Sequence, residues 1–101
     1  MAEFTKVAVV SDIEPGEVKT VQAGSKQIAL ANIEGTFYAI DDMCPHVGGS
    51  LGGGFLNEEN AICPLHGWAF NVKDGSCKTV SGATVSCFQV RVEGDEVQIE
   101  V

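Results

Sequence analysis

The stretch CPHVGGSLGGGFLNEENAICPLHGWAF, residues 44–70, concentrates the reactive chemistry of a 101-residue chain. It contains both histidines, two of the four cysteines, the only tryptophan and six of the twelve glycines. Two clusters share a pattern, Cys44-Pro45-His46 and Cys63-Pro64-Leu65-His66, with sixteen residues between them. Each cluster offers one soft thiolate and one imidazole, and both groups are metal ligands. The stretch therefore predicts a metal centre.

Three interpretations of this pairing are open. The first is coincidence, in which buried cysteines and surface histidines bind nothing. It is weakened because each of the two histidines lies within three residues of a cysteine. The second is a structural zinc ion with Cys₂His₂ ligation, although zinc fingers pair Cys with Cys and His with His. The third is a [2Fe–2S] cluster with two cysteines on one iron and two histidines on the other.

Mixed clusters favour the third interpretation, because each loop then gives one ligand to each iron. Proline in each cluster fixes the backbone and removes one N–H, and the glycines let backbone amides approach the sulfides. By formal oxidation-state counting, two thiolates leave the oxidised centre neutral, whereas four make it a dianion. A neutral centre accepts an electron more readily, so histidine ligation raises the potential to a range of about −150 to +300 mV.

Charge and length restrict the class of protein further. A net charge of −8 disfavours nucleic acid and anionic membranes and favours a partner with a basic docking face. No apolar run approaches the roughly 20 residues that span a bilayer, and the N-terminal residues lack the basic segment of a signal peptide. We therefore expect a cytoplasmic protein whose cysteines are metal ligands or buried thiols rather than disulfides.

The flanking sequence predicts short antiparallel strands. Alternating or β-branched runs occupy residues 4–10, 17–23, 26–34, 36–41, 68–72, 76–80 and 87–101. Turns are expected between these runs at Gly24-Ser25, Glu34-Gly35, Asp74-Gly75 and Gly94-Asp95. No window has helical periodicity, so the predicted class is all-β.

Two further patterns complete the expectation for the fold. Apolar residues spaced by two in the last hairpin predict one buried face, formed by Val90, Val92, Val97, Ile99 and Val101. Residues 41–54, by contrast, have no strand pattern. A loop of that length in a small domain is usually functional.

The two clusters, together with the following Gly67-Trp68-Ala69-Phe70, resemble the Rieske iron–sulfur family. The resemblance extends over residues 1–101 as a single domain. It implies the Rieske fold, a sandwich of antiparallel sheets with cluster-binding loops at about 41–56 and 63–70 at one tip. On that pattern Cys44 and Cys63 ligate one iron, and His46 and His66 ligate the other. The outer ring nitrogens of the two histidines would then make the potential depend on pH.

Within the family, the chain is similar to the small soluble Rieske ferredoxins. Respiratory and photosynthetic Rieske proteins carry an extra, disulfide-bonded cysteine in each loop, where this chain has Gly49 and Leu65. They also carry hydroxyl side chains at the positions that Trp68 and Phe70 occupy here. Without hydroxyl donors the reduced cluster is less stabilised, which predicts a potential in the lower part of the Rieske range.

The resemblance implies a one-electron carrier rather than an enzyme. Such a carrier takes electrons from an NAD(P)H-dependent flavoprotein reductase and passes them to a terminal oxygenase, often one that hydroxylates aromatic rings. We expect a monomer that docks transiently through its tip. One alternative is the small subunit of an assimilatory NAD(P)H nitrite reductase, although some of those subunits lack the cluster ligands. The other is a structural Cys₂His₂ zinc module.

Several residues outside the ligand set have candidate roles. Val47, Leu65 and Trp68 are candidates for an apolar docking rim, with core packing as an equal alternative for Trp68. Cys77 and Cys87 are predicted to be free thiols that are at least partly buried, with a redox-sensitive pair as the alternative.

Acidic residues flank both loops, at Asp41, Asp42, Glu58 and Glu59. Their carboxylates are candidates for guiding a basic partner. A merely solvated acidic loop is the preferred interpretation for Glu58 and Glu59. Asp41 and Asp42 precede Cys44 closely, so their charge is also expected to lower the potential slightly.

Overall fold

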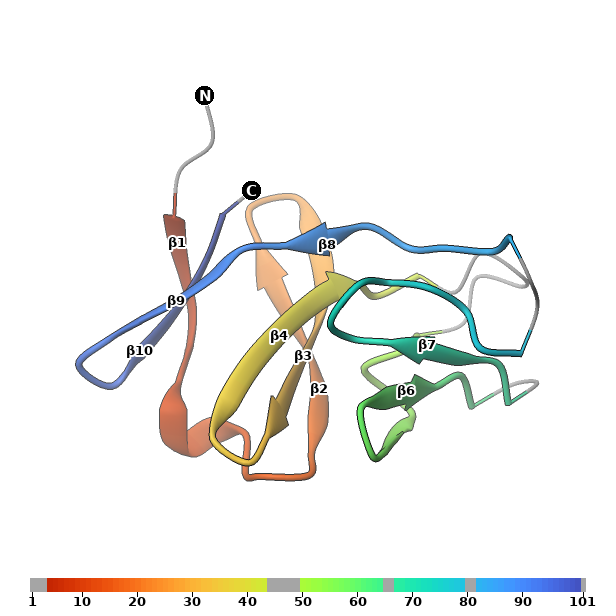
Figure 1. Ribbon diagram of the computed structural model, residues 1–101. Helices are drawn as coiled ribbons and strands as arrows, with labels where there is room; N and C mark the ends of the chain where they lie inside the picture. The colour runs from red at the N-terminus through yellow and green to blue at the C-terminus, as the bar shows by residue number, and fades with distance from the viewer. Residues whose placement is uncertain (1–3, 44–49, 65–66, 80–81, 101) are drawn as a thin grey trace.

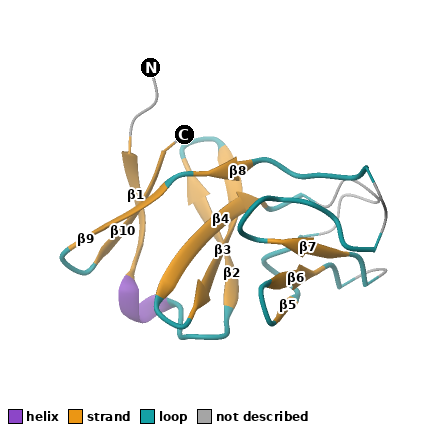
Figure 2. Ribbon diagram, in the orientation of Figure 1, coloured by secondary structure: helices purple, strands orange, loops and turns teal. Residues whose placement is uncertain are grey.

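The computed structural model describes residues 4–43, 50–64, 67–79 and 82–100. Its strands are β1 (Phe4–Val9), β2 (Val18–Ala23), β3 (Lys26–Ile33), β4 (Thr36–Asp41), β5 (Phe55–Asn57), β6 (Asn60–Ile62), β7 (Ala69–Asn71), β8 (Cys87–Phe88), β9 (Val90–Glu93) and β10 (Glu96–Glu100). They form three sheets, in the orders β1-β10-β9, β2-β3-β4-β8 and β5-β6-β7 (Figures 1 and 2). Every pairing of named strands is antiparallel. The predicted all-β class is therefore confirmed.

Helical structure in the described residues amounts to one 3₁₀ turn, η1 (Val10–Asp12), after β1. Among the same residues, no helix is long and apolar enough to span a bilayer.

Three predicted hairpin turns lie where the sequence places them. The cross-strand pairs that close them are Ala23 with Lys26, Ile33 with Thr36, and Glu93 with Glu96. In the turn between β3 and β4, Glu34 and Gly35 have φ angles of 52° and 92°. Two consecutive positive φ angles match a type I′ turn, whose twist fits that of the flanking strands. The first two turns set the register of the β2-β3-β4-β8 sheet, called the central sheet below, and the third sets that of the β9-β10 hairpin.

The central sheet is covered on both faces, and β3 shows how. Ile28 and Leu30 lie in one core cluster with Val97 and Ile99 of the first sheet. Ala29 and Ala31 alternate with them and lie in a second cluster, with Leu51, Cys63 and Phe70. Since successive side chains of a strand point to opposite faces, β3 separates the two cores. The second core connects the central sheet to the small β5-β6-β7 sheet.

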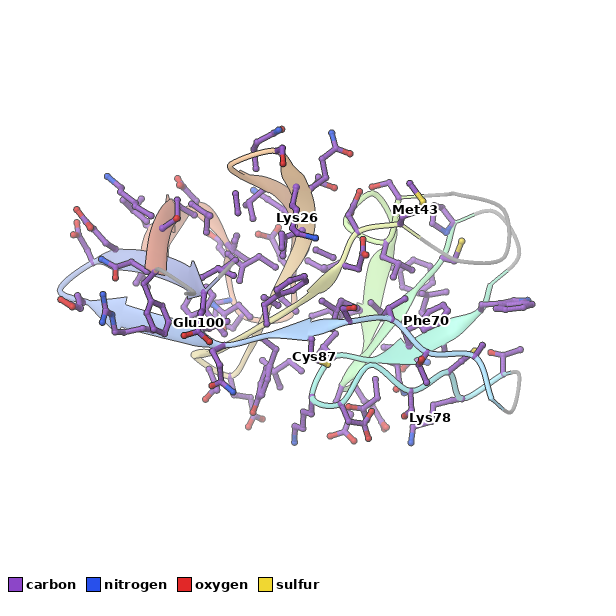
Figure 3. The ribbon with its side chains drawn as sticks, turned by 90° about the horizontal axis from the view of Figure 1, so that it is seen from above. Lys26, Met43, Phe70, Lys78, Cys87 and Glu100 are labelled. Carbon is purple, nitrogen blue, oxygen red and sulfur yellow. The ribbon has the colours of Figure 1, made fainter. Side chains whose placement is uncertain are left out.

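The small sheet lies at one end of the molecule, opposite the turn between β9 and β10 (Figure 1). Seen from above, Met43, Phe70 and Lys78 lie in the half that carries this sheet, and Glu100 lies in the other half (Figure 3). The sequence did not predict β5 and β6, which are three residues each and too short for two-residue periodicity to be recognised. A turn at Glu58, with φ of 58°, joins them.

The expected strand at residues 76–80 was wrong. In the described part of this segment, residues 76–79, the structure has only isolated bridges, from Cys77 to Phe70 and from Ser76 to Thr84. The N–H of Lys78 donates to the carbonyl of Ala69 on β7, whereas the N–H of Cys77 donates to that of Ala83. The segment divides its hydrogen bonds between two neighbours and does not form a ladder with either. The expected turn before it is present at residues 72–74, and Gly75 has a φ of 78°.

The predicted buried face of the last hairpin is only partly formed. Val97 and Ile99 are fully buried, and Val90 is half-buried. Val92 pairs with Val97 but is 46% exposed. β9 is the edge strand of its sheet, whereas β10 lies between two strands. Val92 on β9 is therefore less covered than Val97 on β10. Val101 lies outside the described residues.

The paired valines provide a test of this arrangement. We expect Val97→Ala to lower the free energy of unfolding by about 2 kcal/mol, because it removes buried methyl groups and leaves a cavity. Val92→Ala removes the same atoms from an exposed site and should change it by less than about 0.5 kcal/mol. Urea denaturation of both variants measures the difference. Equal losses would contradict the edge position of Val92.

Candidate metal centre

The structure places one of the four predicted ligands. Cys63 follows β6 and is 1% exposed. Cys44, His46 and His66 lie outside the described residues. Among the described residues, no three His, Cys, Asp or Glu side chains form a group that would hold a metal ion. The described part of the site consists of Cys63 and of the segments that flank residues 44–49 and 65–66.

The second cluster is closed by main-chain hydrogen bonds. The N–H of Cys63 donates to the carbonyl of Trp68 at 2.8 Å, and the N–H of Gly67 donates to the carbonyl of Cys63 at 2.9 Å. Gly67 has a φ of 72°, a conformation that costs a glycine little. The thiol of Cys63 is thus fixed at the end of a short strand, in the core cluster that also holds Leu51 and Phe70.

The first cluster is bracketed by a bridge between Met43 and Ser50. Next to it, the N–H of Leu51 donates to the carbonyl of Asp42 at 2.7 Å. The chain before Cys44 and the chain after residue 49 are therefore held side by side. This pairing continues directly from the end of β4.

The two segments meet at Gly54. An ideal Cβ on Gly54 would overlap the carbonyl oxygen of Ile62 and lie 3.2 Å from Cδ of Pro64. A Cβ on Gly52 would lie 2.5 Å from the backbone nitrogen of Thr20 on β2. Contacts under 3.0 Å do not occur for real Cβ atoms, so both positions need glycine. The chain that follows the first cluster is thus packed directly against the strand that leads into Cys63.

The flanking acids have different surroundings from one another. Asp42 is 4% exposed and accepts hydrogen bonds from Ser50 and Gly52, so the expectation that it guides a partner was wrong. Glu59 pairs with Lys73 at 3.0 Å, and the hydrogen bond from that ammonium lowers the pKa of the Glu59 carboxyl. Glu58 and Glu59 lie at the Asn57–Asn60 end of the β5-β6 hairpin, away from the Ile62 end that leads to Cys63.

Trp68 is half-buried and packs against the second core cluster, with its ring centroid 6.4 Å from that of Phe70. The packing interpretation of Trp68 is therefore confirmed in part. Val47 and Leu65, the other candidates for a docking rim, lie outside the described residues.

Two apolar residues beside the clusters were missed by the sequence reasoning. Met43 is 64% exposed and Phe55 is 59% exposed. Met43 directly precedes Cys44, and Phe55 directly follows Gly54. Their position beside the clusters was the only signal in the sequence, because a lone Met or Phe is ordinarily taken as core.

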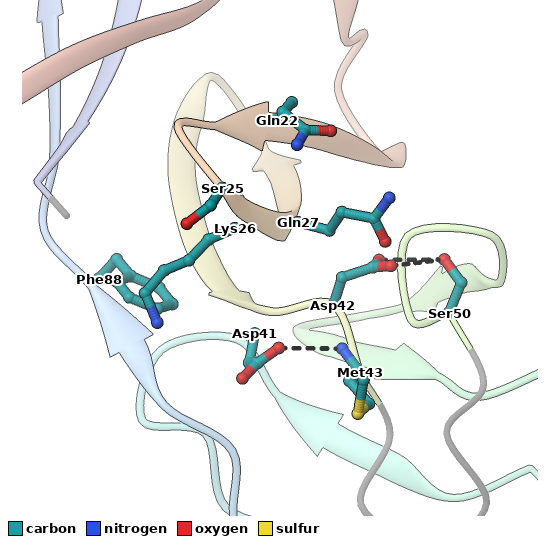
Figure 4. A pocket seen from close by; sticks show the side chains of 9 residues that line it. All are labelled: Gln22, Ser25, Lys26, Gln27, Asp41, Asp42, Met43, Ser50 and Phe88. Atoms are coloured by element: carbon teal, nitrogen blue, oxygen red, sulfur yellow. Dashed lines mark hydrogen bonds between the residues drawn. The ribbon is translucent and has the colours of Figure 1, made fainter.

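A polar groove lies beside Asp41, Asp42, Met43 and Ser50, the described residues next to 44–49. Gln27, Asp41, Met43 and Phe88 are among its lining residues. Figure 4 shows the Asp41 carboxylate accepting a hydrogen bond from the N–H of Met43, at 3.0 Å. The ammonium of Lys26 lies 5.8 Å from the centroid of the Phe88 ring. The groove thus contains charges of both signs, so its surface is neither uniformly acidic nor uniformly basic.

The two remaining cysteines differ in exposure. Cys77 is buried in the second core cluster, as expected. Cys87 on β8 is exposed as a residue, but its sulfur is partly shielded, as expected for the thiol. The sulfur lies against the turn at Gly75, 3.1 Å from an ideal Cβ there. This burial of the sulfur raises the pKa of the Cys87 thiol, and the Asp74 carboxylate adds to the effect.

A model of the Rieske [2Fe-2S] domain matches residues 3–91. The ferredoxin component of an alkene monooxygenase system from Xanthobacter autotrophicus is 35% identical over 98 residues, which cover 96% of this chain and 80% of the relative.

Two solved structures share the fold. A complex of reduced oxygenase and oxidized ferredoxin in carbazole 1,9a-dioxygenase contains a chain that is 34% identical, with a TM-score of 0.85, covering 95% of this chain and 91% of that one. A chain assigned as an NADH-dependent nitrite reductase small subunit from Mycobacterium tuberculosis has a TM-score of 0.91 at 21% identity, covering 100% of this chain and 96% of that one. At that identity the second likeness concerns the fold alone.

The contact at Gly54 yields a prediction about stability. Gly54→Ala should lower the free energy of unfolding by more than about 2 kcal/mol, because its Cβ forces Ile62 and Pro64 to move. The matched control is Gly53→Ala, whose Cβ would meet nothing closer than 3.4 Å and should change stability by less than about 0.5 kcal/mol. Urea denaturation measures both. A tolerated Gly54→Ala would show that the two segments are not packed as described.

The cysteines yield a prediction about reactivity. In the native protein, iodoacetamide should modify Cys87 and spare Cys77, since only the first is exposed. The raised pKa means less thiolate at any given pH. The alkylation rate of Cys87 should therefore continue to rise at pH values where that of a free cysteine has levelled off. Mass spectrometry across a pH series measures this, and Asp74→Asn should move the midpoint down. A profile that coincides with free cysteine would contradict the assigned surroundings.

Proposed function

Since this chain belongs to the Rieske [2Fe–2S] family, we propose that it carries single electrons from an NAD(P)H-dependent flavoprotein reductase to a terminal oxygenase of the aromatic-ring-hydroxylating type. The observation that supports the terminal partner is the 34% identity to a chain from a complex of oxygenase and ferredoxin. The 35% identical relative is likewise the ferredoxin component of an oxygenase system. Both names give a ferredoxin as a component separate from the oxygenase, so the proposed role is that of an electron-transfer component and not of an enzyme.

The proposed ligands are Cys44 and Cys63 for one iron and His46 and His66 for the other. Cys63 is the one proposed ligand among the described residues. It fits a [2Fe–2S] cluster, because it offers a buried thiol at a fixed position. A [2Fe–2S] cluster bound there supplies a single site that accepts and releases one electron. The mixed thiolate and imidazole donors suit this cluster better than a zinc finger, whose loops pair like with like.

The surrounding residues adjust how readily an electron is accepted. The side chains of Leu51 and Phe70 share the core cluster of Cys63 and exclude water from it. Phe70 carries no hydroxyl, and the half-buried Trp68 has only an indole N–H as a donor. We therefore expect a potential in the lower part of the Rieske range, which suits electrons delivered by a flavin.

Further aspects of the proposal concern the partners and the location in the cell. The exposed Met43 and Phe55 beside the clusters give a partner apolar surface close to the ligands. A net charge of −8 favours docking to a basic face. We propose a monomer in the cytoplasm, where the exposed thiol of Cys87 would remain reduced.

The small subunit of an assimilatory nitrite reductase is the second candidate. It is supported by the shared fold of the 21% identical chain. All four ligand positions are filled here, which favours a redox-active carrier over a subunit without a cluster. Reduction by a flavoprotein reductase, followed by reoxidation with either a ring-hydroxylating oxygenase or a nitrite reductase large subunit, separates the two candidates.

The first experiment is a visible absorption and low-temperature EPR spectrum, before and after dithionite. We expect a red-brown protein whose reduced form gives a rhombic signal with an average g value below that of the free electron. Cys63→Ser should lose this signal and the bound iron, because the serine removes a ligand. Cys87→Ser is the matched control and should retain both. A colourless protein that contains zinc and no iron after anaerobic purification would contradict the proposal.

A further inference from the structure

Asp42 is a buried carboxylate beside the proposed site. It follows β4 and is 4% exposed. None of the ion pairs among the described residues includes it. A buried charge without a cation is unfavourable unless hydrogen bonds replace its hydration. Its presence two residues before Cys44 therefore requires an explanation.

The hydrogen bonds of Asp42 converge from two segments of the chain. Its Oδ1 accepts from the N–H of Gly52 at 2.7 Å, from the hydroxyl of Thr20 at 2.9 Å, and lies 3.0 Å from that of Ser50. Its Oδ2 lies 2.9 Å from the same Ser50 hydroxyl, and Figure 4 shows this contact. One side chain thus connects β2, the end of β4 and the chain that returns after residue 49.

The main chain of Asp42 reinforces the same connection. Its carbonyl accepts from the N–H of Leu51 at 2.7 Å, and its N–H donates to the carbonyl of Gln27 at 3.3 Å. The hydroxyls of Thr20 and Ser50 also lie 3.0 Å apart. All the groups that contact the carboxylate of Asp42 are hydrogen-bond donors, and these contacts replace the hydration that the side chain loses on burial.

We propose that Asp42 is a positioning residue for the cluster, with a second effect on its potential, an inference that rests on the proposed function. Its carboxylate holds together the two chain segments that bracket Cys44 and His46. Asp42 also places a carboxylate in the residue two positions before Cys44, whose Cα lies at most about 7 Å from that of Asp42. A negative charge near a cluster opposes the uptake of an electron, and a buried charge is screened less by salt than an exposed one.

Two substitutions separate these effects. Asp42→Asn keeps the shape and one acceptor oxygen for Gly52 and Thr20, and its amide group can donate to the Ser50 hydroxyl. It should retain the cluster and shift the midpoint potential upward. Asp42→Ala removes the shared acceptor of three donors, on Thr20, Ser50 and Gly52. The cluster should then be lost about tenfold faster in the presence of a chelator, as followed by visible absorption.

The control is Asp95→Asn, which removes an equal charge from the exposed turn between β9 and β10. Its potential and its rate of cluster loss should match those of the wild type. Spectroelectrochemical titration of the purified proteins measures the potentials. An Asp42→Asn potential equal to that of Asp95→Asn would overturn the effect of the charge. Unchanged cluster loss in Asp42→Ala would overturn the positioning role.

These results are distinguishable from a failure of the proposed function. If the wild-type protein binds no iron–sulfur cluster, the function itself is wrong, and with it the inference. If the wild type binds the cluster and the Asp42 variants behave like it in both measurements, only the inference is wrong.

Discussion

The burial of β3 on both faces is the constraint on which the rest of the structure depends. A strand whose two faces are both covered has no tolerance for a change of register, because a shift by one residue exchanges the faces. Here the exchange would place Ile28 and Leu30 where Ala29 and Ala31 now lie. The small side chains face the cluster half of the molecule, and the large ones face the first sheet. The alanines allow the small sheet to approach closely, while the larger residues fill the wider space on the other side.

The described segments that flank the proposed metal centre are attached to this sheet. The chain leaves for the first cluster at the end of β4 and returns against β2, where Gly52 packs on the backbone of Thr20. It then passes Gly54, which touches the strand leading into Cys63. Sites held by hydrogen-bonded strands keep their geometry better than sites on free loops. A carrier that must accept and release an electron without rearrangement benefits from this attachment.

The sequence predicted those features that have a local signal. Turns such as Glu34-Gly35 require special backbone angles. The spacing of Cys63 from His66 contributes to the resemblance to the Rieske family, whose domain model matches residues 3–91. Features that depend on distant contacts were not predictable. The β5-β6 hairpin is too short for periodicity, and Val92 is exposed because of its place at the edge of a sheet. Asp42 and Asp41 are indistinguishable in the sequence, yet one is buried among three donors and the other lines a groove.

The difference in burial between Asp42 and the exposed acids determines which of these charges can affect the reduction potential and which can affect partner binding. Glu59 and Lys73 form an exposed pair, and such pairs are weak and screened by salt. Exposed acids therefore affect how a partner approaches more than they affect the energy of the transferred electron. A buried carboxylate is screened far less and acts on the site directly. It follows that the net charge of −8 is a poor guide to the potential. Surface acids are free to change with the partner, whereas position 42 is constrained by the site itself.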